Sequence, residues 1–324
     1  MELHRRKVLR VIAGAAAMEF ASAAKAQSYP SRPVRLIIGY PAGAAADIVG
    51  RLLGQSLSEQ LGQQFVIENR SGANSNLATE AVAHAAADGY TLLLAINSNA
   101  INATLYDKLN FNFIRDFEPV AGIVRTPVVM VVHPSVPAKT LPEFIACAKA
   151  NPDRINMASA GIGNPTHMAG ELFKAMSGVK MVPVHYRGGA PAFADLLGGQ
   201  VQVYFPAVIG AIEYIRSGQL RALAVGSAAR VDLLPDIPTI GDFVPGYEAS
   251  VWVGLNAPKG TSADVIVKLN NAVNMSLGET KFRARLADLG GVAMPMTPRE
   301  FGKLIADDTE KWAKVIRAAH LRAE

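Results

Sequence analysis

The sequence predicts an α/β fold built as two lobes. Short apolar runs rich in Val, Ile and Leu alternate with segments whose apolar residues recur at helical spacing. This is the pattern expected where helices cover a largely parallel sheet. Two proline-rich connections interrupt it, because Pro127 and Pro134 bracket one strand while Pro235, Pro238 and Pro245 crowd a second connection. We therefore expect two lobes joined by two crossings of the chain.

Each expected strand is a short apolar run rich in Val, Ile and Leu, and segments of helical period lie between the strands. The expected strands are 34–40, 65–68, 91–96, 128–132, 155–158, 181–184, 201–205, 220–225 and 251–255. The first helical pattern begins near Ile48 and ends at Gly62, a residue suited to a helix C-terminus. The last helix begins at about Pro298 and carries Phe301 and Trp312 on its apolar face.

The two breaks predict how the chain divides. Lobe one is expected to contain residues 27–125 together with 230–324, and lobe two to contain residues 126–229. Ligands of such folds bind beyond the carboxyl ends of the strands, and a cleft between two lobes can close by a hinge. We therefore expect an interlobe cleft as the binding site.

The amino terminus has the order of a secretory leader. Basic residues at positions 5–10 precede an alanine-rich apolar stretch that ends at Ala26. We expect cleavage near Ala26, with residues 1–26 as signal peptide and a periplasmic mature protein. The alternative, a membrane anchor, is disfavoured because Arg10 and Glu19 interrupt a stretch that is already short for a span. The sequence leaves general and twin-arginine export both open.

Charge and cysteine content exclude several functional classes. The chain has a net charge of +5, but residues 1–26 hold five basic and two acidic residues, so the expected mature chain carries only +2. A net charge this small does not predict a basic surface that would bind nucleic acid or a membrane. Cys147 is the single cysteine, which rules out an internal disulfide, and the histidines lack metal-ligand spacing. We expect no metal, no cofactor and a monomer.

Three turns between a strand and a helix carry the functional signal. They are rich in small residues and occupy positions 40–47, 159–167 and 185–191. Small side chains let a ligand approach the free N–H groups of a helix start, an arrangement that suits a carboxylate. Neither G-x-G-x-x-G nor G-x-x-x-x-G-K-[ST] is present, so nucleotide binding is disfavoured.

Several spaced segments are more specific than any single turn. They are YPSRPV (29–34), VIENRSGA (66–73), ADGYTL (87–92), GNPTH (163–167), YRGGAPA (186–192), LLGGQV (196–201), LAV (223–225), PDIPT (235–239), WVGL (252–255) and KWAKV (311–315). In this order they resemble the solute-binding receptors of tripartite tricarboxylate transporters, the Bug family. The resemblance implies a two-lobed periplasmic binding protein of type II, the Venus-flytrap fold, with mixed sheets covered by helices.

The resemblance also implies a ligand, a partner and site residues. The implied ligand is a small carboxylated metabolite, a di- or tricarboxylate or an aromatic acid, and the implied partners are membrane permease subunits. The ligand-binding positions implied are Ala42, Gly43, Ala44, Asp47 and Asn97 in lobe one, and Ser159, Gly163, Thr166, His167, Tyr186, Gly188, Gly189 and Ala190 across the cleft. Many members of the family carry an acid where this chain has Phe205-Pro206, which favours a plain or aromatic acid over an amino acid.

Two other functional classes remain as alternatives. A binding module that reports to a membrane sensor would have the same sequence features. A cleft hydrolase could use Ser159, His167 and Asp195, but the G-x-S-x-G turn of such enzymes is missing. We therefore expect a receptor without catalytic activity.

Overall fold

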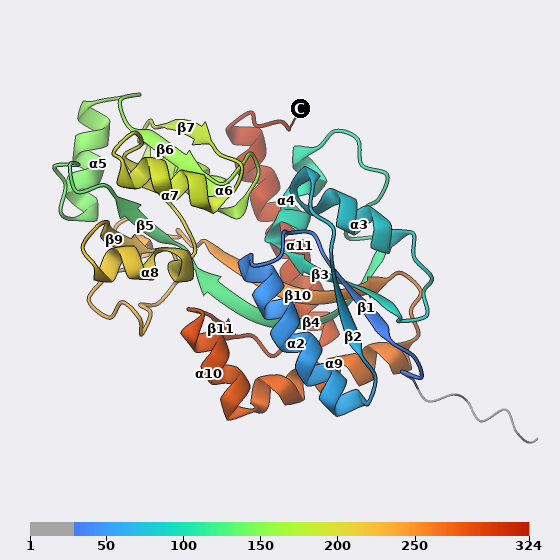
Figure 1. The fold of residues 1–324 in the computed structure, drawn as a ribbon. Coiled ribbons are helices and arrows are strands. Elements are labelled where there is room, and N and C mark those ends of the chain that lie inside the picture. Colours follow the sequence, from blue (N-terminus) through green and yellow to red (C-terminus); the bar gives the residue numbers. More distant parts are fainter. Residues whose placement is uncertain (1–28, 324) are drawn as a thin grey trace, which may run out of the picture.

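Two separate β-sheets organise residues 29–323, the part of the chain that the computed structural model describes (Figure 1). The first sheet has the spatial order β11 (Val292–Ala293), β4 (Phe117–Pro127), β10 (Ser250–Pro258), β3 (Thr91–Ile96), β1 (Val34–Ile38) and β2 (Phe65–Asn69). The second has the order β7 (Val182–His185), β6 (Asn156–Ser159), β8 (Val203–Tyr204), β5 (Val129–Val132) and β9 (Arg221–Val225). The expected α/β class is confirmed. The leader expected at 1–26 lies outside the described residues.

Both sheets are mixed. In the first, β1 pairs in parallel with β2 and β3, whereas β10 runs antiparallel to β3 and β4. In the second, β6 is parallel to β7 and β8, and β5 is antiparallel to β8 and β9. The sequence pattern did not reveal β4, because Pro119, Gly122 and Arg125 interrupt its apolar run and its register against β10 is irregular.

Helices cover both faces of the first sheet. One face carries α2 (Ala45–Leu61), α9 (Ala263–Gly278) and α10 (Thr280–Asp288), and the other carries α3 (Asn76–Ala83), α4 (Asn97–Leu105) and α11 (Pro298–Ala318). Successive side chains of β1 alternate between them, because Leu36 and Ile38 pack with α2 while Ile37 packs with α3 and α11. The short turns η1 (Ala73–Ser75) and η2 (Ile240–Asp242) complete the connections.

The second sheet is sandwiched in the same way. Its two layers of helices are α7 (Gly189–Leu197) with α8 (Val208–Arg216), and α5 (Leu141–Ala150) with α6 (Pro165–Ser177). The last helix, α11, joins the two halves, since Phe301 packs in the first core and Trp312 in the second. In Figure 1 it runs from beneath the first sheet towards the second.

The chain passes from one sheet to the other twice. It leaves the first sheet at Pro127 and returns at Ser250, and the preceding Tyr247 and Ala249 are buried in the core of the second. We propose that lobe one comprises 29–127 with 250–323 and lobe two 128–249, whereas the sequence placed the second boundary at 230. Across residues 29–323, no helix combines the length and apolar character needed to cross a bilayer.

Candidate ligand-binding site

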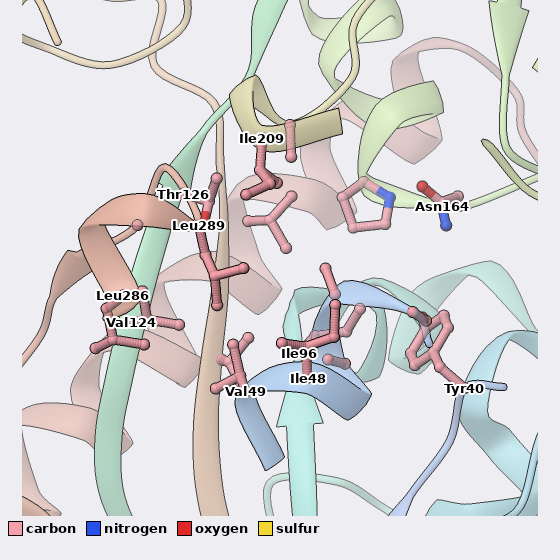
Figure 2. A pocket seen from close by; sticks show the side chains of 18 residues that line it. Tyr40, Ile48, Val49, Ile96, Val124, Thr126, Asn164, Ile209, Leu286 and Leu289 are labelled. Carbon is pink, nitrogen blue, oxygen red and sulfur yellow. The ribbon is translucent and has the colours of Figure 1, made fainter. Parts of the chain in front are cut away.

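A cavity of about 200 Å³ lies between the two sheets (Figure 2). It sits beyond the carboxyl ends of β1 and β3 from the first sheet and of β6 and β8 from the second, where ligands of such folds bind. The residues that line it are Tyr40, Ala44, Ala45, Ala46, Ile48, Val49, Ile96, Val124, Thr126, Asn164, Pro165, Ala207, Ile209, Val251, Val253, Leu286, Leu289 and Gly291. The expected interlobe position of the site therefore corresponds to a real cavity.

The start of α2 supplies unpaired main-chain donors to this cavity. Ala44 is the extended residue before the helix, with φ −68° and ψ 158°, and no side chain caps the helix start. Among residues 29–323, no acceptor is paired with the N–H groups of Ala45, Ala46 and Asp47. Alanine side chains leave these groups accessible, and the helix dipole makes this end positive. The arrangement is suited to holding an anion.

Asp47 fixes the shape of this turn. Its buried carboxylate accepts hydrogen bonds of 2.9 Å from the Gly43 N–H, from Arg51 Nε and from Asn69 Nδ2. Burial by itself raises the pKa of the Asp47 carboxyl, but the bonds from Arg51, Gly43 and Asn69 outweigh it and leave the pKa below its ordinary value. With both oxygens engaged in these bonds, Asp47 positions the turn.

The lowered pKa of Asp47 predicts an acid-dependent stability. A carboxyl whose pKa is lowered by folding stabilises the protein at a pH above the pKa of the unfolded state, 3.8. That stabilisation is lost as the pH falls through the pKa of the folded state. We expect Asp47→Asn to lower the free energy of unfolding by about 2 kcal/mol at pH 7, because three donors lose a charged acceptor. The deficit relative to wild type is expected to shrink as the pH falls below 3.8. Thermal unfolding of both proteins between pH 7 and pH values below 3.8 measures this stability deficit. A deficit that is independent of pH would contradict the role given to Asp47.

Polar side chains gather at one side of the cavity. Figure 2 shows Tyr40 and Asn164 on the same side, away from Val124 and Leu286. The Asn164 Oδ1 caps α6 by accepting the Thr166 N–H at 3.1 Å, and its Nδ2 has no acceptor among the described residues. The Tyr40 hydroxyl lies 2.8 Å from Ser98 Oγ. The α2 donors, Tyr40 and Asn164 thus form a polar end built from both lobes.

A hydrogen bond between the lobes lies beside this polar end. Asn74 Nδ2 donates to the Gly163 carbonyl at 3.3 Å, and the same amide group donates to Asn102 Oδ1 at 2.9 Å. Gly163 has a left-handed φ of +70°, and a Cβ there would come within 2.0 Å of Leu105 Cδ2. Glycine is therefore required where the turn of lobe two meets α4 of lobe one.

The rest of the cavity is apolar. Its walls are Ile48, Val49, Ile96, Val124, Ile209, Val251, Val253, Leu286 and Leu289, with Thr126 as the one hydroxyl among them. In the part of the chain that the structure describes, no Asp, Glu, Lys, Arg or His lines the cavity. The site therefore offers neutral donors at one end and an uncharged surface everywhere else.

Ser159 and His167, both predicted as ligand contacts, are fully buried beneath the Gly163 turn. Ser159 Oγ is 2.7 Å from His185 Nδ1, and His167 Nδ1 accepts the Gly163 N–H at 3.2 Å. The two imidazole rings meet edge to face at 4.6 Å. Burial, followed by repulsion from His167, lowers the pKa of His185. The cluster supports the turn from below through the bond to the Gly163 N–H.

Other predicted positions also have structural partners. Asn97 Nδ2 donates to the Ser250 carbonyl at 2.9 Å, tying α4 to β10, and Thr166 Oγ1 accepts the Ala160 N–H at 3.1 Å. Of the first turn, Ala44 lines the cavity, whereas Ala42 and Gly43 are exposed just before it.

The third predicted turn lies apart from the cavity lining. The Tyr186 hydroxyl donates to Asp195 Oδ2 at 2.7 Å. Gly188, Gly189 and Ala190 do not line the cavity. A Cβ on Gly189 would lie 3.7 Å from Tyr204 Oη.

The three residues weighed as a hydrolytic set are not assembled. Ser159 pairs with His185, His167 with the Gly163 N–H, and Asp195 with Tyr186. Residues 29–323 contain no group of three His, Cys, Asp or Glu side chains placed to hold a metal ion.

Several residues that line the cavity were not predicted from the sequence. Ala207 and Ile209 lie at the start of α8, just after Pro206. This segment repeats the order of a strand, a turn and a helix, so the sequence could have pointed to it. Tyr40 and Asn164 belong to two of the turns that the sequence predicts as ligand-binding, although the predicted contacts are their neighbours. Leu286 and Leu289 at the end of α10 carried no local signal.

The chain is similar to known receptors over nearly its whole length. A family model described as tripartite tricarboxylate transporter family receptor matches residues 49–321. Protein BugT of Bordetella pertussis is 36% identical over 300 residues, covering 92% of each chain. The structure of R. palustris Rpa4515 with adipate has a TM-score of 0.83 and 32% identity, covering 91% of this chain and 99% of that one. MatC from Rhodopseudomonas palustris, with bound malate, has a TM-score of 0.79 and 32% identity over 89% of this chain and all of its own (100%).

Proposed function

The chain belongs to the tripartite tricarboxylate transporter receptor family, and on this basis we propose that it captures a small carboxylated metabolite in the cavity between its lobes. The observation that carries the proposal is the start of α2, where the N–H groups of Ala45, Ala46 and Asp47 have no acceptor in residues 29–323. The solved relatives with adipate and malate support a carboxylate as the ligand class.

The α2 donors and the apolar lining together can supply the binding free energy that a receptor needs. Each charge-assisted hydrogen bond contributes about 1.5 to 3 kcal/mol. Three such bonds contribute about 4.5 to 9 kcal/mol before the cost of ordering the ligand is subtracted, so burial of the ligand's apolar body must supply part of the roughly 8 kcal/mol of micromolar affinity. A bound carboxylate that contacts α2 of lobe one and Asn164 of lobe two favours the closed arrangement of the lobes, because it has both partners only there.

We further propose that the protein binds its ligand without chemistry, as an exported monomer that delivers it to membrane permease subunits. Within 29–323, Ser159, His167 and Asp195 pair with other partners and do not form a hydrolytic set, which supports binding alone. Export rests on the leader expected at 1–26 and on the family.

Titration calorimetry with acids and their amides tests the proposal. Benzoate and hexanoate are compared with benzamide and hexanamide, which keep the body of each ligand and remove its charge. We expect at least one acid to bind with micromolar affinity and its amide to bind at least about a hundredfold more weakly, because the amide lacks the charge-assisted bonds. Equal binding of acid and amide, or binding of neither across a wider panel of carboxylates, would contradict it.

A further inference from the structure

The turn before α3 has a strained backbone. Ala73, Asn74 and Ser75 have φ values of +45°, +51° and +77°, so three consecutive residues other than glycine lie in the left-handed region. A side chain with a Cβ makes this conformation unfavourable, although asparagine tolerates it better than alanine or serine does. Such a turn persists only where the surrounding structure holds it, and strained residues of this kind gather at functional sites. The contacts that hold Asn74 therefore indicate what the turn is for.

Asn102 of α4 fixes the orientation of the Asn74 amide. Asn102 Nδ2 donates to the Asn74 carbonyl and to Asn76 Oδ1, both at 2.7 Å, so the other side of the Asn102 amide can only accept. Asn74 Nδ2 donates to this Asn102 Oδ1 at 2.9 Å. Asn102 is fully buried, so these bonds hold the Asn74 amide in one orientation, with its NH2 group as the donor.

The same NH2 group joins the two lobes. Asn74 Nδ2 also donates to the Gly163 carbonyl at 3.3 Å, while the Gly163 N–H donates to His167 Nδ1 at 3.2 Å. Gly163 is therefore held from both lobes, and the next residue, Asn164, lines the cavity. On the lobe-one side, the Tyr40 hydroxyl lies 3.4 Å from Asn74 Oδ1. Asn74 thus connects Tyr40 and Asn164, the two polar side chains that lie on the same side of the cavity (Figure 2).

The bond between Asn74 and Gly163 can form only while the lobes are together. Once the lobes part, both groups bond to water instead, so the bond stabilises the closed arrangement alone. A ligand enters an open receptor and leaves after the lobes have parted. The bond is therefore expected to slow ligand dissociation and to leave association nearly unchanged.

We propose that Asn74 is a positioning residue that keeps the loaded receptor closed and holds Asn164 towards the ligand. The left-handed turn at 73–75 places the amide where it reaches both lobes. This inference rests on the proposed carboxylate binding and deepens it, because it assigns retention of the ligand to a side chain that does not line the cavity.

The rates of ligand binding, measured by stopped-flow fluorescence, test the inference. Asn74→Gly and Ala73→Gly both put glycine at a left-handed position of the same turn, but only Asn74→Gly removes the amide. With a carboxylate that binds the wild type, we expect Asn74→Gly to raise the dissociation rate constant by about two- to tenfold, the range for one uncharged hydrogen bond. The association rate constant is expected to stay close to the wild-type value, and Ala73→Gly to leave both rate constants unchanged.

Asn76→Ala is the control for a loosened network within lobe one. Asn76 accepts from Asn102 and has no bond to lobe two among the described residues, so this variant is expected to change only the melting temperature. If dissociation is no faster in Asn74→Gly than in Ala73→Gly, or if Asn76→Ala speeds it equally, the inference is wrong while carboxylate binding stands. If no carboxylate binds, the proposed function itself fails and this inference fails with it.

Discussion

Replacing Ala207 with aspartate is expected to weaken carboxylate binding by about fiftyfold or more. Ala207 precedes α8 and lines the cavity, and no side chain caps that helix start. A carboxylate bound in the cavity at about 7 Å from the new aspartate is repelled by about 2.4 kcal/mol at an effective dielectric constant of about 20.

Ala207→Asn is the matched control, since asparagine has the same shape without the charge. Both residues are good helix caps, so both variants are expected to melt at the wild-type temperature or slightly above it. Calorimetry is expected to show a much larger loss of affinity for Ala207→Asp than for Ala207→Asn. Equal losses in the two variants would mean that charge in the cavity does not matter to the ligand.

Ala45→Pro is expected to weaken carboxylate binding by about tenfold to a hundredfold while leaving the fold intact. Proline at the first position of a helix removes one N–H group that has no helical partner, and that group is one of the proposed donors. Ala44 already has φ −68° and ψ 158°, the extended conformation that a residue before proline requires. One charge-assisted bond contributes about 1.5 to 3 kcal/mol, which corresponds to the expected loss.

The control for this variant is Ala45→Val, which adds similar bulk but keeps the N–H group. We expect Ala45→Val to retain most of the wild-type affinity, and both variants to have similar melting temperatures. If valine weakens binding as much as proline does, the effect is steric and the main chain of α2 is not the donor.

Local sequence signals identified the turns that form the polar end of the cavity. The small residues between β1 and α2 predicted a helix start open to a ligand, and the Asn164-Pro165 pair predicted the capped start of α6. Both features depend on neighbours in the chain, because caps and first-turn prolines act within one turn of a helix. Such features can therefore be recognised without knowledge of the fold.

The apolar wall could not be predicted in the same way. Val49, Val124, Val253 and Leu289 lie far apart in the sequence, and each looks like an ordinary core residue of its own helix or strand. Only the packing of β4 and β10 against α2 and α10 brings them to one surface. Similarly, the engagement of Asp47 depends on Asn69 from β2, which no local pattern connects to it.

The turn before α7 occupies a different place in the fold. Its glycines had the same local pattern as the turn before α2, yet Gly188 and Gly189 do not line the cavity. A turn of small residues before a helix predicts only that the helix start is accessible. The tertiary fold decides which of these starts face the space between the sheets.

A crystal structure of the protein with bound 4-methylbenzoate or hexanoate tests the central claim most directly. We expect the carboxylate oxygens within about 2.7 to 3.1 Å of main-chain nitrogens at the start of α2, with the apolar body against Leu286 and Leu289. A carboxylate bound at the turn before α7, or a ligand lying outside the space between the two sheets, would contradict the account.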